Sequence, residues 1–451
     1  MLHVCYGNQL EVLADQLAEH LDSRAVGPLE PELIAVQGHA VSRWLALRLA
    51  TDRGISANNQ MLFPAELLWL LFRRVLPEDV PPFNGFSAQT LAWRVLALLQ
   101  SEQFGSGYAA LAHYLETASP ISQWQLAERL GRQFEQYLIY RPDWIHRWES
   151  GGDTHWQAAL WRRLLATGDD RHWLNLRARL VEVMAQEPAA ADRLPARISL
   201  FGLPSLSEVY LGILQTVAAY CDVRIYALNY SSVFWADIVS DKERTRRALS
   251  DQSGLADYME TGNSLLASLG RQGRAYFGQL LELDALDEEV FHPPVSNTLL
   301  GQIQSDIFYL REGGDEGAQR EVEPSDDSIQ IHVCHSPMRE VEVLHDRLLD
   351  QFDRQPDLDP AEVLVLVPDI ETYTAYIEAV FGSLTDDRRI PFRIADCGQS
   401  QRSSLIETFF ALLDMPFGRY DATGVSTPLF EPAIQKQFGL SGTDVDQILH
   451  W

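Results

Sequence analysis

The residues most suited to chemistry in this sequence are arginines and aromatic residues that alternate between Trp124 and Trp148. The arginines are Arg129, Arg132, Arg141 and Arg147, and the aromatic residues between and beside them are Phe134, Tyr137, Tyr140, Trp144 and Trp148. Aromatic faces stack on unpaired bases, and guanidinium groups contact phosphates or stack as well. The pattern therefore predicts a surface for single-stranded nucleic acid. The alternative is a helix that buries its aromatic stripe, which is the commoner use of such spacing.

Three shorter patterns also contain residue types that could carry chemistry. Gly270–Arg274 contains G-x-x-G, which can clamp a nucleic-acid backbone but more often forms a helix end or turn. Leu283–Val290 resembles the acidic strand end of a nucleotide-binding domain, although Gly278–Glu289 has the spacing of a solvated helix. The neighbours Cys334 and His335 do not face each other as a nucleophile and its base must. No catalytic motif is found, so the sequence leaves open whether the chain is an enzyme in its own right.

A triphosphate-binding loop needs the pattern G-x-x-x-x-G-K-[ST], whose backbone amides and lysine hold the phosphates while its hydroxyl holds magnesium. No Gly-Lys dipeptide occurs, and the turn after the first apolar run, Tyr6–Gln9, has one glycine and no lysine. We therefore expect no ATP, magnesium or other cofactor site in this chain. The four cysteines are scattered, which predicts neither a disulfide framework nor a metal site and fits a reducing cytoplasm.

The net charge of −27 over 451 residues argues against general binding to a polyanion, although local basic patches can exist within an acidic chain. No apolar run reaches the roughly 18 residues that a membrane span needs. The N-terminus lacks the basic and apolar regions of a signal peptide. The sequence thus predicts a soluble cytoplasmic protein with no membrane contact.

Short apolar runs alternate with amphipathic helices over much of the chain. The expected strands are Leu2–Cys5, Leu33–Val36, Ile198–Phe201, Val223–Leu228, Ile329–Cys334 and Val363–Val367. Asn8 is expected to cap the first helix, and Ser336 with Pro337 is expected to begin another. Strands that alternate with helices predict parallel sheets covered by helices.

The length exceeds what one hydrophobic core usually supports, so several domains are expected. Residues 1–80 and 196–310 are predicted to form one α/β domain in two segments, separated by an all-helical insertion at 81–195. That insertion holds seven of the 11 tryptophans, which predicts a packed core of its own. Residues 311–328 are charged and predict a linker, and 329–451 are predicted to start a second, truncated α/β domain.

Several segments together resemble the RecC family, and they follow one another in order along the whole chain. The most similar are QFEQYLIYRPDWIHRWE (133–149), NSLLASLGRQGRAY (263–276), IQSDI (303–307) and IHVCHSPMREVEVLHDRLL (331–349). The opening MLHVCYGNQLEVL, PELIAVQ (31–37) and YIEAVFGS (376–383) are also similar. Full members of the family are much longer, so the resemblance makes this chain the N-terminal portion.

The resemblance implies a superfamily-1 helicase-like fold, with sheets like those of P-loop NTPases but without a P-loop. It implies a non-catalytic, DNA-binding subunit of RecBCD (exodeoxyribonuclease V), the ATP-dependent helicase and nuclease that processes double-strand DNA ends for recombinational repair. Such a subunit channels the unwound 3′-ended strand and recognises the hotspot Chi. The implied partners are RecB-like and RecD-like subunits in a heterotrimer, double-stranded DNA ends and single-stranded DNA. ATP and magnesium would belong to the partner subunits.

The resemblance also carries strand-reading residues onto this sequence. Gln37, Trp69 and Arg141 match the family's pattern, as an amide that reads base edges, a stacking face and a planar charged donor. Six other positions, His39, Arg43, Phe63, Arg132, Gln133 and Trp173, hold residues that differ from the best-known pattern, and Glu135 replaces an aspartate. A bidentate base contact contributes about 1–3 kcal/mol of discrimination. We therefore expect a non-identical or relaxed Chi sequence.

Two other functions remain open from the residues alone. A scaffold of the AddB or RexB type often keeps a glycine loop or iron–sulfur cysteines, neither of which is visible here. A protein-interaction module without DNA contact would differ in lacking salt-dependent binding of single-stranded DNA. An active ATPase is disfavoured by the missing phosphate loop.

Overall fold

The computed structural model describes the chain in two compact units, Met1–Ser328 and Ile329–Trp451. The described residues are 1–23, 27, 29–101, 108–166, 170–250, 261–313, 321–383, 388–395 and 403–450. In this part of the chain, no helix is long and apolar enough to cross a bilayer.

The first unit contains a six-stranded sheet in which every pair of neighbours is parallel. Its strands are β1 (Leu2–Gly7), β2 (Glu32–Val36), β3 (Asn59–Leu62), β4 (Arg197–Phe201), β5 (Asp222–Leu228) and β6 (Leu286–Glu289), in the order β3-β2-β4-β5-β1-β6. The predictions of an α/β protein with a parallel sheet and of strands at β1, β2, β4 and β5 are confirmed. The two outermost strands, β3 and β6, were not predicted.

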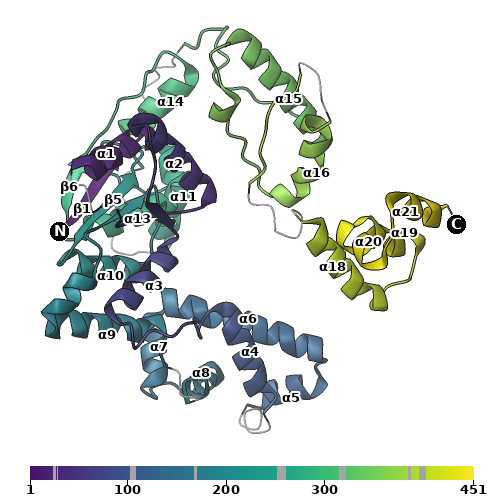
Figure 1. The fold of residues 1–451 in the computed structure, drawn as a ribbon. Helices are drawn as coiled ribbons and strands as arrows, with labels where there is room; N and C mark the ends of the chain where they lie inside the picture. The colour runs from purple at the N-terminus through teal and green to yellow at the C-terminus, as the bar shows by residue number, and fades with distance from the viewer. Residues whose placement is uncertain are drawn as a thin grey trace. The chain divides into compact units, whose positions relative to one another are not determined.

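Helices cover both faces of the sheet (Figure 1). On one face lie α1 (Leu10–Ser23) and α2 (His39–Arg53), and on the other lie α3 (Pro64–Val75), α9 (Trp173–Gln186), α10 (Glu208–Ala218) and α13 (Arg271–Leu281). Alternate strand residues serve the two cores: Val4 and Ile225 face the larger core, whereas Cys5 and Tyr226 face the smaller one. Burial on both faces explains why the central strands are almost continuously apolar.

Between β3 and β4 the described residues form helices only. After α3 they are α4 (Ala88–Leu99), α5 (Ala109–Thr117), α6 (Pro120–Tyr140), α7 (Pro142–Glu149), α8 (Trp156–Ala166), α9 and the short 3-10 helix η2 (Pro188–Arg193). A separate core contains the fully buried Phe134 and Trp161. Helices α4 and α6 approach closely at Gly131, where a Cβ would lie 2.5 Å from the Ala88 carbonyl oxygen.

The remaining helices complete the two units. The first unit also contains α11 (Asp241–Ser250), α12 (Ser264–Leu269) and α14 (Leu299–Phe308). The second contains α15 (Pro337–Arg354), η5 (Pro360–Glu362), α16 (Ile370–Phe381), α18 (Ser404–Asp414), η6 (Met415–Phe417), α19 (Ala422–Ser426), η7 (Thr427–Phe430), α20 (Pro432–Phe438) and α21 (Gly442–Leu449). The predicted start of α15 is confirmed, because Ser336 accepts a hydrogen bond from the Arg339 N–H and Pro337 is its first residue.

Four expectations about local structure are wrong. Ile329–Cys334 and Val363–Val367 form no strand, because an apolar run becomes a strand only when a neighbour pairs with it, and none does so among the described residues. Leu283–Val290 is not helical, since β6 lies within it and pairs with β1. The Asn8 side chain does not act as the expected helix cap: it exchanges two hydrogen bonds with the backbone of His292, at 2.8 and 2.9 Å.

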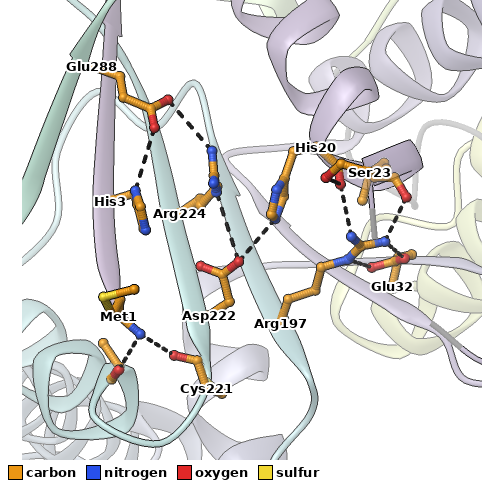
Figure 2. Close-up of polar contacts among 12 residues, drawn as sticks. Met1, His3, His20, Ser23, Glu32, Arg197, Cys221, Asp222, Arg224 and Glu288 are labelled. Atoms are coloured by element: carbon orange, nitrogen blue, oxygen red, sulfur yellow. Dashed lines mark hydrogen bonds and ion pairs between the residues drawn. The ribbon is translucent and has the colours of Figure 1, made fainter. Parts of the chain in front are cut away.

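Polar side chains form a network across the amino ends of the strands (Figure 2). Arg197 on β4 pairs with Glu32 on β2 and donates to the His20 and Leu21 carbonyl oxygens, both at 2.9 Å. Farther along, His20 lies 3.6 Å from the carboxylate of Asp222 on β5. Arg224, also on β5, and His3 on β1 both pair with Glu288 on β6 (Figure 2). Side-chain contacts thus connect β2, β4, β5, β1 and β6 in addition to the ladder hydrogen bonds.

His20 makes the stability of this unit depend on pH. Burial and the positive charge of Arg224 lower the pKa of His20 from 6.5 to about 4. Between about pH 4 and pH 6.5, the unfolded chain therefore binds a proton at His20 that the folded chain does not bind. The contribution of His20 to the free energy of unfolding is fully present above about pH 6.5 and is lost as the pH drops toward 4. In the wild type, we expect the titration of His20 to lower the free energy of unfolding by about 2 kcal/mol between pH 7 and pH 5. His20→Asn should abolish this decrease.

Urea unfolding at the two pH values measures this loss, because ten of the 11 tryptophans lie in the first unit and their fluorescence reports on it. The control is His113→Asn, since His113 is exposed on α5. An equal pH dependence in the wild type and His20→Asn would show that His20 is not responsible.

Candidate nucleic-acid interface

Four of the predicted strand-reading residues lie at the carboxyl ends of β2 and β3. Gln37 directly follows β2 and is exposed, and His39 begins α2 two residues later. Phe63 directly follows β3 and precedes Pro64, the first residue of α3. Because β2 and β3 are parallel and paired, the segments that follow them emerge side by side. The carboxyl edge is where open parallel sheets bind ligands.

A ring contact joins two members of this group. The His39 and Phe63 rings meet edge to face, with their centroids 5.0 Å apart. The Phe63 N–H donates to Glu66 Oε2 at 2.9 Å, which fixes the first turn of α3. Arg43 is exposed one turn after His39 on α2. An exposed amide, an aromatic pair and a guanidinium are thus presented on one edge. We refer to Gln37, His39, Arg43 and Phe63 as the β2–β3 cluster.

Trp69 does not belong to the β2–β3 cluster. It is half-buried on α3, packs against the larger core and meets the Phe72 ring edge to face with centroids 6.1 Å apart. The contacts of its ring that the structure shows are therefore with the core.

A second group of predicted residues lies on α6 and at its end. Arg132 is exposed and pairs with Glu128 one turn earlier, while Gln133 is half-buried. Glu135 Oε1 accepts a hydrogen bond from the Ala88 N–H at 3.1 Å, so this carboxylate also joins α6 to the start of α4. Arg141 joins α6 to α7, is exposed, and places its guanidinium 5.7 Å from the Trp144 ring centroid.

The structure buries or half-buries most of the aromatic side chains between Trp124 and Trp148. Phe134 and Trp148 are buried in the core of the helical segment, and Tyr137 and Trp144 pack against it. Tyr140 and Arg141 are exposed at the end of α6. Most of the aromatic stripe is therefore core, and Tyr140 at the end of α6 remains exposed beside Arg141.

Tyr210 lies near Pro64 at the start of α3 and near Glu135 on α6, and it was not singled out in the sequence. Its ring contacts Trp173 edge to face at 5.9 Å, and it lines a small apolar cleft together with Pro64 at the start of α3. Burial raises the pKa of Tyr210, and the nearby Tyr140 and Glu135 raise it further. These neighbours place the start of α10 between α3 and the end of α6. In the sequence, Tyr210 could have been noticed because it follows soon after the predicted strand Ile198–Phe201.

The turn after β1 is short, and its residues make hydrogen bonds and packing contacts with other parts of the unit. The Gly7 carbonyl oxygen accepts from the Asn229 N–H at 2.8 Å, and a Cβ at Gly7 would lie 3.1 Å from side chains of Leu13 and Val290. Tyr6 packs edge to face on Phe277, with centroids 5.7 Å apart. Side chains thus occupy the carboxyl end of β1, where a phosphate loop would need open backbone amides.

The G-x-x-G sequence forms the junction of α12 and α13, as the turn interpretation predicted. A Cβ at Gly270 would lie 2.5 Å from the Leu266 carbonyl oxygen, and one at Gly273 would lie 3.1 Å from the Tyr230 ring. Arg274 pairs with Glu243 and donates to the Ile238 carbonyl oxygen. Both glycines therefore have a packing role.

The comparisons with known proteins agree on one family. Residues 2–310 match the family model described as RecC, N-terminal domain. Over 100% of its length, the chain is 33% identical to the RecBCD enzyme subunit RecC of Escherichia coli (strain K12) and 31% identical to that of Haemophilus influenzae, covering 44% and 46% of those proteins. It is 29% identical to the same subunit of Mycolicibacterium smegmatis, covering 42% of it. The chain spans less than half the length of these curated relatives.

Proposed function

This chain belongs to the RecC family, and on that premise we propose that it is the non-catalytic, strand-reading part of a RecBCD-type helicase and nuclease. In this proposal it binds DNA during the processing of double-strand ends for recombinational repair. It channels the unwound 3′-ended strand and recognises a Chi-like hotspot. RecB-like and RecD-like subunits supply ATP hydrolysis and cleavage, and the assembly works in the cytoplasm on double-stranded ends and single strands.

The observation that carries the proposal is the β2–β3 cluster. Its position at the carboxyl edge of a parallel sheet is the place where such sheets bind ligands. A side-chain amide can read base edges, and an aromatic face can stack on a base. The exposed Arg141 and Arg132 at α6 add donors for phosphates. We extend the proposal to the domain plan, with 1–80 and 196–310 as one helicase-like domain, 81–195 as its insertion and 329–451 as the start of a second.

Two variants separate base reading from phosphate contact. We expect Arg141→Gln to weaken binding of all single strands and to lower the slope of log affinity against log salt by about 0.7, since one phosphate contact is lost. We expect Gln37→Ala to leave that slope unchanged and to reduce the preference between sequences by about 5- to 150-fold. Fluorescence anisotropy with labelled oligonucleotides over a range of salt measures both.

The controls are Arg179→Gln and Gln60→Ala, which change exposed residues of the same unit outside these groups. Salt-independent binding, or none by the wild type, would contradict the proposal and favour a protein-interaction module. In the complex reconstituted with RecB-like and RecD-like subunits, nicking at the hotspot of the best-known family members is expected to be reduced, because His39, Arg43 and Phe63 differ from their pattern. Undiminished nicking there would refute the altered specificity.

A further inference from the structure

Two aromatic side chains lie exposed on the loop that follows β5, at the same edge of the sheet as the β2–β3 cluster. Tyr230 is 41% exposed and Phe234 is 56% exposed. In the order of strands, β4 alone separates β2 from β5, so the two sites are about 10 Å apart along the edge. The loop thus continues the carboxyl edge on which the proposed reading group lies.

Hydrogen bonds and buried aromatic rings hold this loop in place. The Trp235 indole donates to Asn229 Oδ1 at 2.7 Å, and the Ser231 hydroxyl donates to the Phe308 carbonyl oxygen at 2.9 Å. Trp235 is buried and stacks on Phe277 with their ring planes 12° apart. Tyr230 and Phe234 therefore rest on a fixed aromatic layer, and a ligand that stacks on them would not have to order the loop.

The start of α13 adds polar and charged groups beside these rings. A Cβ at Gly273 would lie 3.1 Å from the Tyr230 ring. Gln272 Nε2 donates to Ser205 Oγ at 3.0 Å, in the loop after β4. Arg271 is exposed in the same first turn and forms no ion pair with any described residue. Of the nearby carboxylates, Glu243 is paired with Arg274, and Asp237 is exposed. A helix start with an arginine favours an anion.

We propose that Tyr230, Phe234 and Arg271 form a second contact for single-stranded DNA, adjacent to the β2–β3 cluster. This inference rests on the proposed function and deepens it by extending the path of the strand along the carboxyl edge. Exposed aromatic faces next to a cation suit single strands, because every base has a face to stack and every nucleotide carries a phosphate. Ser205, which hydrogen-bonds to Gln272, follows β4, the strand between β2 and β5.

The test measures binding of the full chain to a labelled oligothymidylate over a range of salt. We expect Phe234→Ala to weaken binding by about 5- to 150-fold with an unchanged salt slope, since stacking is lost but no phosphate contact is. Phe234→Trp should restore the affinity. Arg271→Gln should lower the slope by about 0.7. The control for the aromatic change is Phe417→Ala, which removes an exposed ring in the second unit.

The outcomes distinguish this inference from the function on which it rests. If the wild type binds and Phe234→Ala, shown to be folded by circular dichroism, binds equally well, the second contact is refuted while the proposed function stands. If the wild type does not bind the oligonucleotide at all, both are refuted. Crosslinking of a photoactivatable thymidine to Tyr230 or Phe234 would support the inference, and crosslinking confined to other residues would oppose it.

Discussion

Arg197→Met is expected to lower the free energy of unfolding of the first unit by about 3–5 kcal/mol. The Arg197 side chain is 5% exposed and pairs with Glu32 through two nitrogens, with Nε 2.7 Å from the carboxylate. Its removal leaves a carboxylate that is itself largely buried and deprives two backbone carbonyls of α1 of their donor. Breaking one partner of such a pair costs far more than the pair contributes against an apolar replacement.

Urea unfolding followed by tryptophan fluorescence measures the loss. The control, Arg179→Met, removes an exposed arginine that pairs with Asp79 and Glu182, and it should cost at most about 1 kcal/mol. The double variant Arg197→Met with Glu32→Leu should recover most of the loss, because no unpaired charge then remains. A loss for Arg197→Met no larger than for the control would show that the network at the amino edge contributes little.

Trp161→Ala is expected to destabilise the helical segment by about 3–5 kcal/mol. The Trp161 side chain is fully buried and contacts the rings of Phe86, Phe134 and His172. Its indole also donates to Glu149 Oε1 at 3.1 Å, and that carboxylate meets His172 at 2.9 Å. Alanine would leave a large cavity and remove a donor from a half-buried carboxylate.

Hydrogen exchange resolved by segment separates this local loss from unfolding of the sheet. We expect faster exchange in α6–α8 with little change in β1, β4 and β5. Trp93→Ala serves as the control, since Trp93 belongs to the same segment but is 64% exposed. Equal protection of α6–α8 in Trp161→Ala and Trp93→Ala would contradict this view of the core.

The central part of the sheet could be predicted because burial on both faces requires unbroken apolar runs. Such runs mark β1, β2, β4 and β5. The edge strand β6 has the sequence LDEE and pairs on one side only, so its acidic residues remain accessible and gave a misleading helical pattern. The opposite error occurred in the second unit, where Ile331 and Val333 lie in an apolar run that remains largely exposed.

The candidate site was predictable only in part. Gln37 and Phe63 emerge side by side because β2 and β3 pair in parallel, and since β3 was not predicted, this placement was not foreseen. The approach of Tyr210 to Trp173 depends on how the helical segment packs on α10, which no local pattern encodes. The family resemblance named Trp69 among the strand-reading residues, but only the structure shows how much of its surface is used for packing.

The turn after β1 also bears on how such a chain could change over time. A phosphate loop would require several added residues, a lysine and a second glycine. It would also require that the Gly7 carbonyl release Asn229, that Asn8 release His292, and that Tyr6 leave Phe277. Each of these three releases removes a hydrogen bond or a ring contact of β1 or of the turn that follows it. A phosphate loop at this turn would therefore need several coordinated changes, and single substitutions offer no gradual route to it.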